Sequence, residues 1–185
     1  MTTAGIVLAA GRSQRFGEDD KLLADLNGQP LCNHAARAMR QCPVDFRIAC
    51  ISNPSVRAEF EGYTIVEGAG RQSQSLVAGL RKAIEFGAER VLITLADMPN
   101  ISSSVLAALL KTNAPIAACR TAQGTMTVPA VFGQDIFPDL LALKGDKGAR
   151  AILNARDQIS FVEISARDAF DIDTAVDLEA LRKAR

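Results

Sequence analysis

A short apolar segment that ends on a glycine constrains this sequence more than any other feature. Ile6–Ala10 holds no polar residue and begins with β-branched side chains, which is typical of a strand buried on both faces of a parallel sheet. Gly11 then allows a tight turn and the close approach of an anion to backbone N–H groups. Arg12, Arg15 and Lys21 follow it and add three positive charges. The sequence therefore predicts an α/β chain with a nucleotide site at the carboxyl end of its first strand.

Two common phosphate-binding loops do not fit this turn. The dinucleotide pattern G-x-G-x-x-G requires glycines where Ser13 and Phe16 stand. The Walker pattern requires Gly-Lys-Ser/Thr, and the run at 16–18 is Phe-Gly-Glu. Nucleotide binding therefore depends on another kind of loop, and the alternative is a glycine-containing turn with solvated charges.

The run L-A-A-G-x-S-x-R-F-G-x-x-x-K at residues 8–21 resembles the signature loop of nucleotidyltransferases of the molybdenum-cofactor type. In that family the loop embraces the nucleoside triphosphate, and the resemblance implies catalytic roles for Arg15 and Lys21. The nucleotide-binding positions that it implies here are Leu8, Ala9, Ala10, Gly11, Ser13, Arg15 and Lys21. Alanines before the glycine resemble the cytidylyl branch of the family more than the guanylyl branch, where glycines are usual.

A second loop rich in glycine and hydroxyl groups, residues 67–75, follows a predicted strand at 63–66. The helix after this loop has an apolar face at 3–4 spacing. The residues that form this face are Leu76, Leu80, Ala83, Ile84 and Gly87. Ser73 or Ser75 can provide the N-terminal cap of the helix, which is the simplest reading of both serines.

The same loop, read as G-R-Q-S-Q-S-L-V-A-G-L, resembles the second nucleotide-contacting loop of cytidylyltransferases. The resemblance implies that Gly70, Arg71 and Ser75 meet the nucleotide. The start of the following helix contributes roughly half a positive charge nearby, which favours a bound anion. A helix cap without a binding role remains the alternative.

The segment Arg90–Leu95 is the most strand-like of the chain, and it ends in Ala96-Asp97-Met98-Pro99. A carboxylate at the carboxyl end of a central parallel strand faces the same crevice as Gly11. Mg²⁺ is usually held by one or two carboxylates together with substrate phosphates. Asp97 in this Asp-Met-Pro run also resembles the family's metal ligand. We therefore expect Asp97 to bind Mg²⁺ and take part in catalysis, with Ala96 beside the nucleotide.

The segment Val128–Phe132 carries Pro129, which predicts an edge position or the start of a strand because proline lacks a backbone N–H donor. Molybdopterin cytidylyltransferases often have Gly-His-Pro here, and this chain has Thr127-Val128-Pro129. The departure concerns the second substrate and leaves the expected reaction type unchanged.

The run G-D-K-G-A-R at residues 145–150 also resembles the family. Lys147 and Arg150 suit an anionic acceptor or a departing pyrophosphate. The alternative is a plain helix start, in which Asp146 caps the helix and Gly145 allows the turn.

The D-I-D-T run at 171–174 resembles the second acidic cluster of the family, which closes over the active site. It makes Asp173 the expected second metal ligand, with Asp171 as the alternative. Acidic residues at a helix start are also favourable on their own account. The last helix should be capped by Thr174 and turn Ala175, Leu178 and Leu181 inward.

Alternating strands and helices predict a doubly wound, Rossmann-like three-layer α/β sandwich with a mostly parallel sheet and a mixed edge after residue 115. No repeat or linker divides the chain, so we expect one nucleotidyltransferase domain over residues 1–185.

Composition limits the other classes of function. The 21 basic and 21 acidic residues cancel, which argues against a nucleic-acid or membrane-surface partner. The four cysteines lack metal-like spacing and fit a reducing, cytoplasmic compartment. His34 is the single histidine, which disfavours a catalytic triad or a histidine-rich zinc site.

The expected reaction is nucleotidyl transfer, in which an acceptor phosphate attacks the α-phosphorus of a nucleoside triphosphate and pyrophosphate leaves. Such a reaction needs alignment, a metal ion and cations rather than a protein nucleophile. The resemblance implies CTP and molybdopterin as substrates, with a recipient molybdoenzyme or chaperone as a further partner. The alternatives are a guanylyl- or cytidylyltransferase for another phosphorylated metabolite, and a non-catalytic nucleotide- or cofactor-binding accessory protein.

Overall fold

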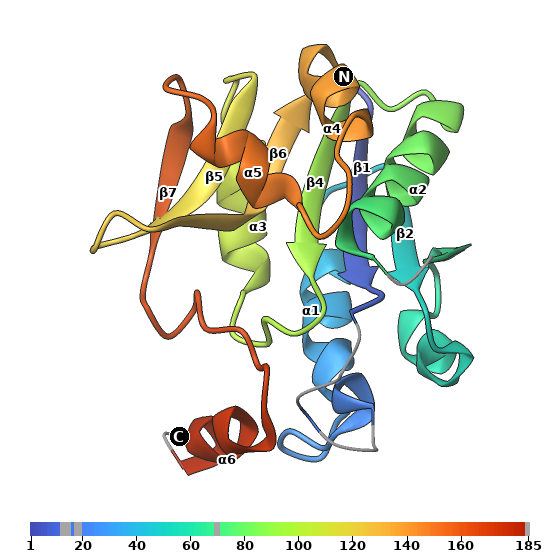
Figure 1. Cartoon of the computed structure of the whole chain (residues 1–185), viewed down its shortest axis with the longest axis vertical. Helices are drawn as coiled ribbons and strands as arrows, with labels where there is room; N and C mark the ends of the chain where they lie inside the picture. The colour runs from blue at the N-terminus through green and yellow to red at the C-terminus, as the bar shows by residue number, and fades with distance from the viewer. Residues whose placement is uncertain (12–15, 17–19, 69–70, 184–185) are drawn as a thin grey trace.

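The computed structural model describes residues 1–11, 16, 20–68 and 71–183 (Figure 1). The predictions for Arg12, Ser13, Arg15 and Gly70 fall outside this range. Within it, seven strands form one sheet in the order β3-β2-β1-β4-β6-β5-β7. The strands are β1 (Thr3–Ala9), β2 (Phe46–Ile51), β3 (Thr64–Glu67), β4 (Arg90–Leu95), β5 (Ile116–Thr121), β6 (Met126–Gly133) and β7 (Ser160–Ile164).

The sheet is parallel around β1 and mixed beyond β4. Strands β3, β2, β1 and β4 run parallel to one another, whereas β6 is antiparallel to both β4 and β5. Strand β7 is again parallel to β5. The chain winds outward from β1 to β3 and then returns to β4 on the other side of β1. The carboxyl ends of β1 and β4 therefore flank the switch point, where doubly wound sheets bind ligands.

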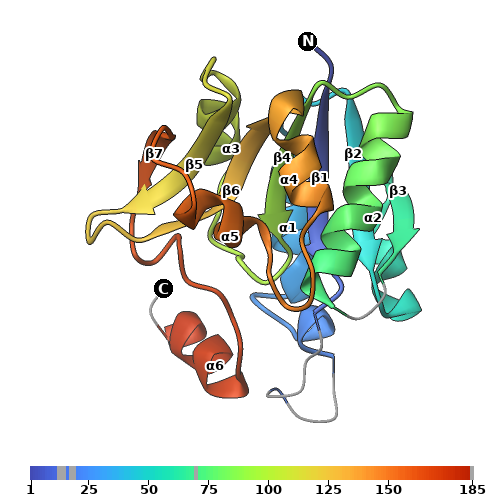
Figure 2. The same cartoon turned by 45° about the horizontal axis from the view of Figure 1, so that its top comes forward.

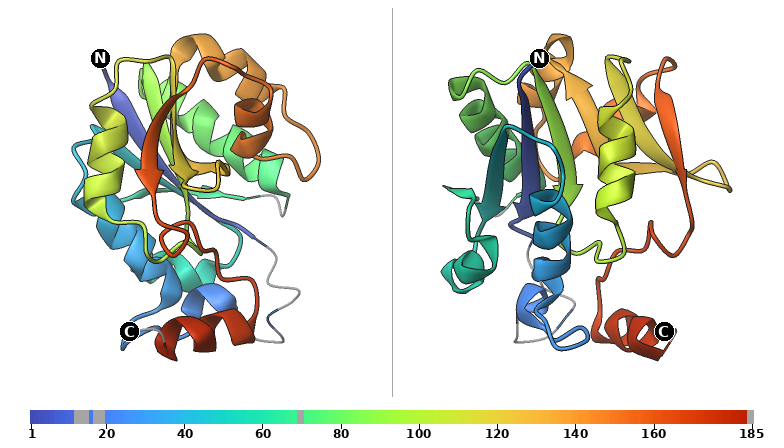
Figure 3. Two further views of the ribbon diagram at one scale, coloured as in Figure 1. Left: turned by 90° about the vertical axis from the view of Figure 1, so that its left-hand side faces the viewer. Right: turned by 180° about the vertical axis from the view of Figure 1, so that it is seen from behind.

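Helices cover both faces of the sheet, as the edge-on view in Figure 3 shows. Helices α1 and α3 lie on one face, and α2, α4 and α5 lie on the other. Helix α6 lies beyond the carboxyl ends of the central strands, next to η1 (Figure 2). The helices are α1 (Leu31–Arg40), α2 (Gln72–Glu85), α3 (Ser103–Leu110), α4 (Phe137–Leu141), α5 (Ala149–Asn154) and α6 (Ala175–Lys183), with 3-10 turns η1 (Lys21–Leu23), η2 (Pro54–Phe60) and η3 (Gln134–Ile136). This arrangement confirms the predicted three-layer, mostly parallel fold.

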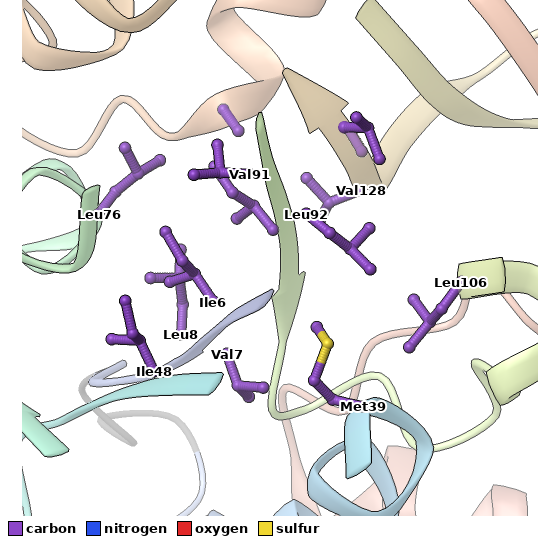
Figure 4. Close-up of a cluster of buried hydrophobic side chains, with 14 of the residues drawn as sticks. Ile6, Val7, Leu8, Met39, Ile48, Leu76, Val91, Leu92, Leu106 and Val128 are labelled. Atoms are coloured by element: carbon purple, nitrogen blue, oxygen red, sulfur yellow. The ribbon is translucent and has the colours of Figure 1, made fainter. Parts of the chain in front are cut away.

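Strand β1 is buried along its whole length, and its side chains alternate between the two halves of the core. Ile6 and Leu8 lie on the side of Leu76 from α2, whereas Val7 points toward Met39 of α1 (Figure 4). Gly5 is required where α1 crosses the strand, because a Cβ atom there would lie 2.4 Å from the sulfur of Met39. The buried strand predicted from the apolar run is confirmed and begins earlier, at Thr3.

The prediction that Pro129 marks an edge or a strand start is wrong. Strand β6 lies between β4 and β5, and Pro129 is its fourth residue. Pairing with β4 ends at Ala130, and the register with β5 shifts between Ala118 and Cys119. Pro129 therefore sits in an interior strand where neither neighbouring ladder needs its missing N–H.

Three local predictions about helices are also wrong. Gly148, not Asp146, occupies the N-cap position of α5, and the helix begins at Ala149. Ala175 is exposed because the buried face of α6 consists of Leu178 and Leu181. Ile84, which was expected on the apolar face of α2, is 42% exposed.

The helices that are described include none that is both long and apolar enough to cross a membrane.

Candidate functional site

The carboxyl ends of β1 and β4 lie side by side in the sheet. Leu8 pairs with Leu95, and the N–H of Ala96 donates to the carbonyl of Leu8 at 3.0 Å. Ala10 and Gly11 continue from β1, and Asp97 lies two residues after the end of β4. The two segments that the sequence analysis singled out therefore meet at the switch point.

The loop after β3 packs directly against the first loop. A Cβ atom on Gly68 would lie 2.4 Å from the Cβ of Ala10 and 2.7 Å from the hydroxyl of Ser75. The N–H of Gly68 donates to the carbonyl of Ile51 at 2.6 Å, which fixes this approach. The structure thus brings Ala10 and Ser75 together, as expected if both border one nucleotide. Sequence reasoning passed over Gly68, although its place in a glycine-rich loop was a usable signal.

Lys21 lies between two carboxylates, those of Asp97 and Asp173, and the three side chains form a charge cluster at these strand ends. The Lys21 side chain is only 7% exposed. Its Nζ atom donates to Asp97 Oδ2 at 2.7 Å and to the carbonyl oxygen of Ile172 at 2.8 Å, and lies 3.4 Å from Asp173 Oδ1. One ammonium group thus joins three segments that are distant in sequence.

The electrostatics of the cluster favour an additional cation. Burial raises the pKa of Asp97, the Lys21 ammonium opposes that rise, and the negative charge of Asp171 adds to it. Asp97 Oδ1 is buried and has no hydrogen-bond partner among the described residues. A buried carboxylate oxygen without a partner is costly unless something else binds it.

This donor set fits Mg²⁺ in the way that metal usually binds. Mg²⁺ takes one or two carboxylates and completes its octahedron with water and substrate phosphates. Asp97 Oδ1 offers one such ligand, and Asp173 or Asp171 a second. In the part of the chain that the structure describes, no three His, Cys, Asp or Glu side chains converge on one metal position. The fit is therefore to a metal held jointly with a substrate rather than to a cage made of protein alone.

The first turn of α2 differs from the prediction that a serine caps it. Arg71 occupies the N-cap position, and no described side chain caps the helix. Ser73 and Ser75 lie inside the first turn, since the helix already begins at Gln72. Ser75 Oγ donates to the carbonyl of Arg71 at 3.3 Å, and Ser73 Oγ donates to the carbonyl of Gly145 at 2.6 Å. Both serines are buried donors to backbone oxygens, and the cap prediction is wrong.

The turn at 145–148 lies against the start of α2. Gly145 has a φ of 67°, which confirms the predicted turn residue. Gly148 lies against the Gln72 side chain, because a Cβ atom on Gly148 would lie 2.7 Å from the amide carbon of Gln72. The start of α2 and the turn of the G-D-K-G-A-R run are therefore in direct contact.

The structure separates Lys147 and Arg150, which were expected to act together. Arg150 lines a cavity of about 240 Å³ at the strand ends, together with Leu8, Gln72 and Asp171. Its guanidinium donates to Thr127 Oγ1 at 3.0 Å. Lys147 lines a different cavity of about 670 Å³ between α4 and α5, whose other basic residues are Lys144 and Arg156.

Comparison with known proteins identifies the family. The MobA-like NTP transferase domain matches residues 5–159. The chain belongs to this family. It is thus a nucleotidyltransferase by family, and its fold is that of the family. The matched region contains Gly11, Lys21 and Asp97, whereas Asp171 and Asp173 lie beyond it.

Full-length similarity extends this result. The chain is 28% identical to the purine catabolism protein PucB of Bacillus subtilis (strain 168), over 97% of this chain and 96% of that protein. It is also 28% identical to a probable molybdenum cofactor guanylyltransferase of Mycobacterium avium (strain 104), covering 100% and 98% of the two chains. The crystal structure of Rv0371c from Mycobacterium tuberculosis H37Rv superimposes with a TM-score of 0.86 at 26% identity, with 98% of each chain covered. The MobA-like fold thus accounts for nearly the whole chain.

Proposed function

We propose that this MobA-like nucleotidyltransferase moves a nucleoside monophosphate, CMP in the first place, from the triphosphate to a phosphorylated acceptor. Molybdopterin is the acceptor that we propose, and pyrophosphate is the second product. A recipient molybdoenzyme or chaperone is the proposed further partner. The family match supports the reaction class, and the charge cluster around Lys21 supports its chemistry.

The observation that carries the proposal is the buried Oδ1 atom of Asp97, which has no partner in the described part of the chain. This oxygen stands at the end of the central strand β4, and Lys21 occupies the other carboxylate oxygen at 2.7 Å. A carboxylate that is half bound and half free at a switch point is suited to a divalent cation shared with a ligand. Bound Mg²⁺ would supply Lewis-acid stabilisation of charge on the phosphate oxygens.

The reaction itself requires no covalent step on the protein. An oxygen of the acceptor phosphate forms a bond to the α-phosphorus, the bond from that phosphorus to the bridging oxygen breaks, and its electron pair leaves with pyrophosphate. In this proposal Lys21 and Arg15 hold phosphate oxygens, and Asp97 and Asp173 hold the metal. Leu8, Ala9, Ala10 and Gly11 face the nucleotide from the first loop, and Ser13 joins them.

The second loop and the cavity at the strand ends would serve the two ends of the reaction. We assign Gly70, Arg71 and Ser75, with Ala96, to the base and ribose, because Gly68 holds that loop against Ala10. Arg150 then faces the acceptor, since it lines the cavity of about 240 Å³ beside Leu8 and Asp171. Lys147 belongs to the acceptor side in this proposal, and its separate cavity makes it the weaker assignment.

The base is the least constrained part of the proposal. Ala9 and Ala10 favour CTP by their resemblance to the cytidylyl branch. The Mycobacterium avium relative is named a guanylyltransferase, which makes GTP the competing donor. A non-catalytic nucleotide-binding protein is the alternative from another class.

A single assay separates these outcomes. The protein is incubated with Mg²⁺, molybdopterin and each of the four nucleoside triphosphates in turn, and pyrophosphate release is measured. The proposal predicts release with CTP that depends on molybdopterin. If GTP were the one triphosphate that gave pyrophosphate release, the base would be reassigned to guanine. Nucleotide binding without pyrophosphate release would support the accessory role.

A further inference from the structure

A second hydrophobic cluster, separate from the main core, connects the C-terminal helix to the site. Its buried members are Leu26, Leu31, Ile172, Leu178 and Leu181. Phe16, from the signature loop, and Ala24 pack against it. Helix α6 thus shares an apolar core with residues on both sides of Lys21, and Figures 2 and 3 show it beside η1. These contacts connect Phe16 and the segment around Lys21 to α6.

Ile172 joins this cluster to the charged site. Its side chain is fully buried in the cluster. Its N–H donates to the carbonyl of Asp97 at 2.9 Å, and its carbonyl accepts from Lys21 Nζ at 2.8 Å. A shift of this one residue would therefore move both polar partners.

The segment between Ile172 and α6 is fixed as well. One carboxylate oxygen of Asp177 accepts from the N–H of Asp173 at 3.1 Å and from the N–H of Thr174 at 2.7 Å. Thr174 Oγ1 in return accepts from the N–H of Asp177, which is the reciprocal capping arrangement of a helix start. Asp173 is consequently held at a fixed distance from the leucines of α6.

We propose that Ile172, anchored by Leu178 and Leu181, is a positioning residue that sets the place of Lys21 and Asp97 for nucleotide binding. This inference rests on the proposed function for its consequence, although its geometry does not. All three residues lie beyond residue 159, where the family match ends. The C-terminal segment is then a working part of the site rather than an appended helix.

The test compares Leu181→Ala with Leu109→Ala. Both remove a buried leucine, but Leu109 belongs to the main core on α3. We expect Leu181→Ala to weaken nucleoside triphosphate binding by about two- to thirty-fold with and without Mg²⁺, the range over which residues along a coupled network act. Leu109→Ala should leave the Kd unchanged below its melting temperature. Leu181→Met conserves volume and should restore binding.

Kinetics distinguish positioning from simple loss of folded protein. A smaller folded fraction lowers kcat and leaves the KM for the triphosphate unchanged, whereas a displaced Lys21 raises that KM. Labelling of Lys21 by an amine-reactive reagent, read by mass spectrometry, gives a measurement that needs no substrate. The amine is nearly buried in the wild type, and we expect Leu181→Ala to speed its labelling several-fold.

The outcomes separate the two proposals. If Leu181→Ala behaves like Leu109→Ala in Kd, KM and labelling, the positioning role is overturned. If the wild type binds no triphosphate, the proposed function fails, and the labelling of Lys21 alone then decides whether α6 holds the lysine in place. Should Leu181→Ala not fold, Leu181→Val makes the same comparison with a smaller change.

Discussion

The surroundings of Lys21 and those of Arg150 lie at the same edge of the sheet but use their hydrogen-bonding capacity differently. Lys21 is nearly buried, and protein oxygens from Asp97, Ile172 and Asp173 surround its ammonium group. Arg150 is exposed and lines a cavity, with a bond to Thr127 Oγ1. The first region is organised before any ligand arrives, and the second leaves room for one. In the proposed function, charge stabilisation is built into the fold, while acceptor recognition is left to the more open surroundings of Arg150.

The largest effect should come from Asp97→Asn, which keeps the shape of the side chain and removes its charge. Turnover should fall by at least ~100-fold, because several kcal/mol of transition-state stabilisation depend on the metal. Folding should survive. The measurement is kcat at saturating Mg²⁺ and triphosphate, with thermal unfolding of the same sample.

The matched control is Asp135→Asn in η3, which removes an exposed carboxylate that is not part of the charge cluster around Lys21. Asp173→Asn should act in the same direction as Asp97→Asn, with a smaller loss. Comparing it with Asp171→Asn then shows which of the two is the second ligand. Wild-type turnover in Asp97→Asn would remove this carboxylate from the metal site.

Lys21→Ala should have the next largest effect. Loss of one charge-assisted contact costs about 1.5–3 kcal/mol, so triphosphate binding should weaken roughly ten-fold or more. The substitution also leaves Asp97 and Asp173 without the ammonium between them, and the melting temperature should fall. Lys82→Ala, at a partly exposed position of α2, is the control for a lost lysine. Calorimetric titration that gives equal affinities for both variants would exclude Lys21 from the nucleotide site.

Arg150→Ala and Lys147→Ala test the open region. Arg150 lines the cavity beside the strand ends. Removal of its side chain should therefore raise the KM for the acceptor by about two- to ten-fold and leave triphosphate affinity unchanged. Lys147 faces another cavity and should have the smaller effect. Steady-state kinetics with the acceptor varied measure both. An equal or larger effect of Lys147→Ala would place the acceptor between α4 and α5.

Ser75→Ala should produce the smallest change. The buried hydroxyl donates to the carbonyl of Arg71, so its removal should lower stability by about 0.5–1.5 kcal/mol. If the second loop borders the base, the ratio of CTP to GTP affinity should also shift. A variant with a lower melting temperature and the wild-type ratio would leave Ser75 with a structural role alone.

Local chemistry made much of the fold predictable. Strand β4 has the predicted ends, because it is an apolar run rich in β-branched residues that stops at the turn carrying Asp97 and Pro99. The position of β6 was not predictable from Pro129, since its tolerance depends on a register shift in β5 that only pairing reveals. The start of α2 was misread because serines at 73 and 75 bond to backbone carbonyls, one of them 72 residues away.

The site was predictable in its parts but not in its connections. Asp97 stood out as a charge after a buried strand, and Lys21 stood out as one of the charges that follow Gly11 and as a position of the signature loop. The carbonyl of Ile172 carried no such signal, since any residue has one and its direction depends on tertiary packing. The apolar residue between two aspartates was the available clue, since its buried side chain anchors the segment that carries both acids.

The measurement that tests the account most directly follows the α-phosphorus. The wild-type protein is given Mg²⁺, molybdopterin and CTP labelled at the α-phosphate, and the label is located among nucleotide, acceptor and protein. Direct transfer between two anions predicts that the label appears in the acceptor product, with unlabelled pyrophosphate in equal amount and none on the protein. The account would be contradicted if the label stayed in CTP, appeared as free CMP, or became attached to the protein.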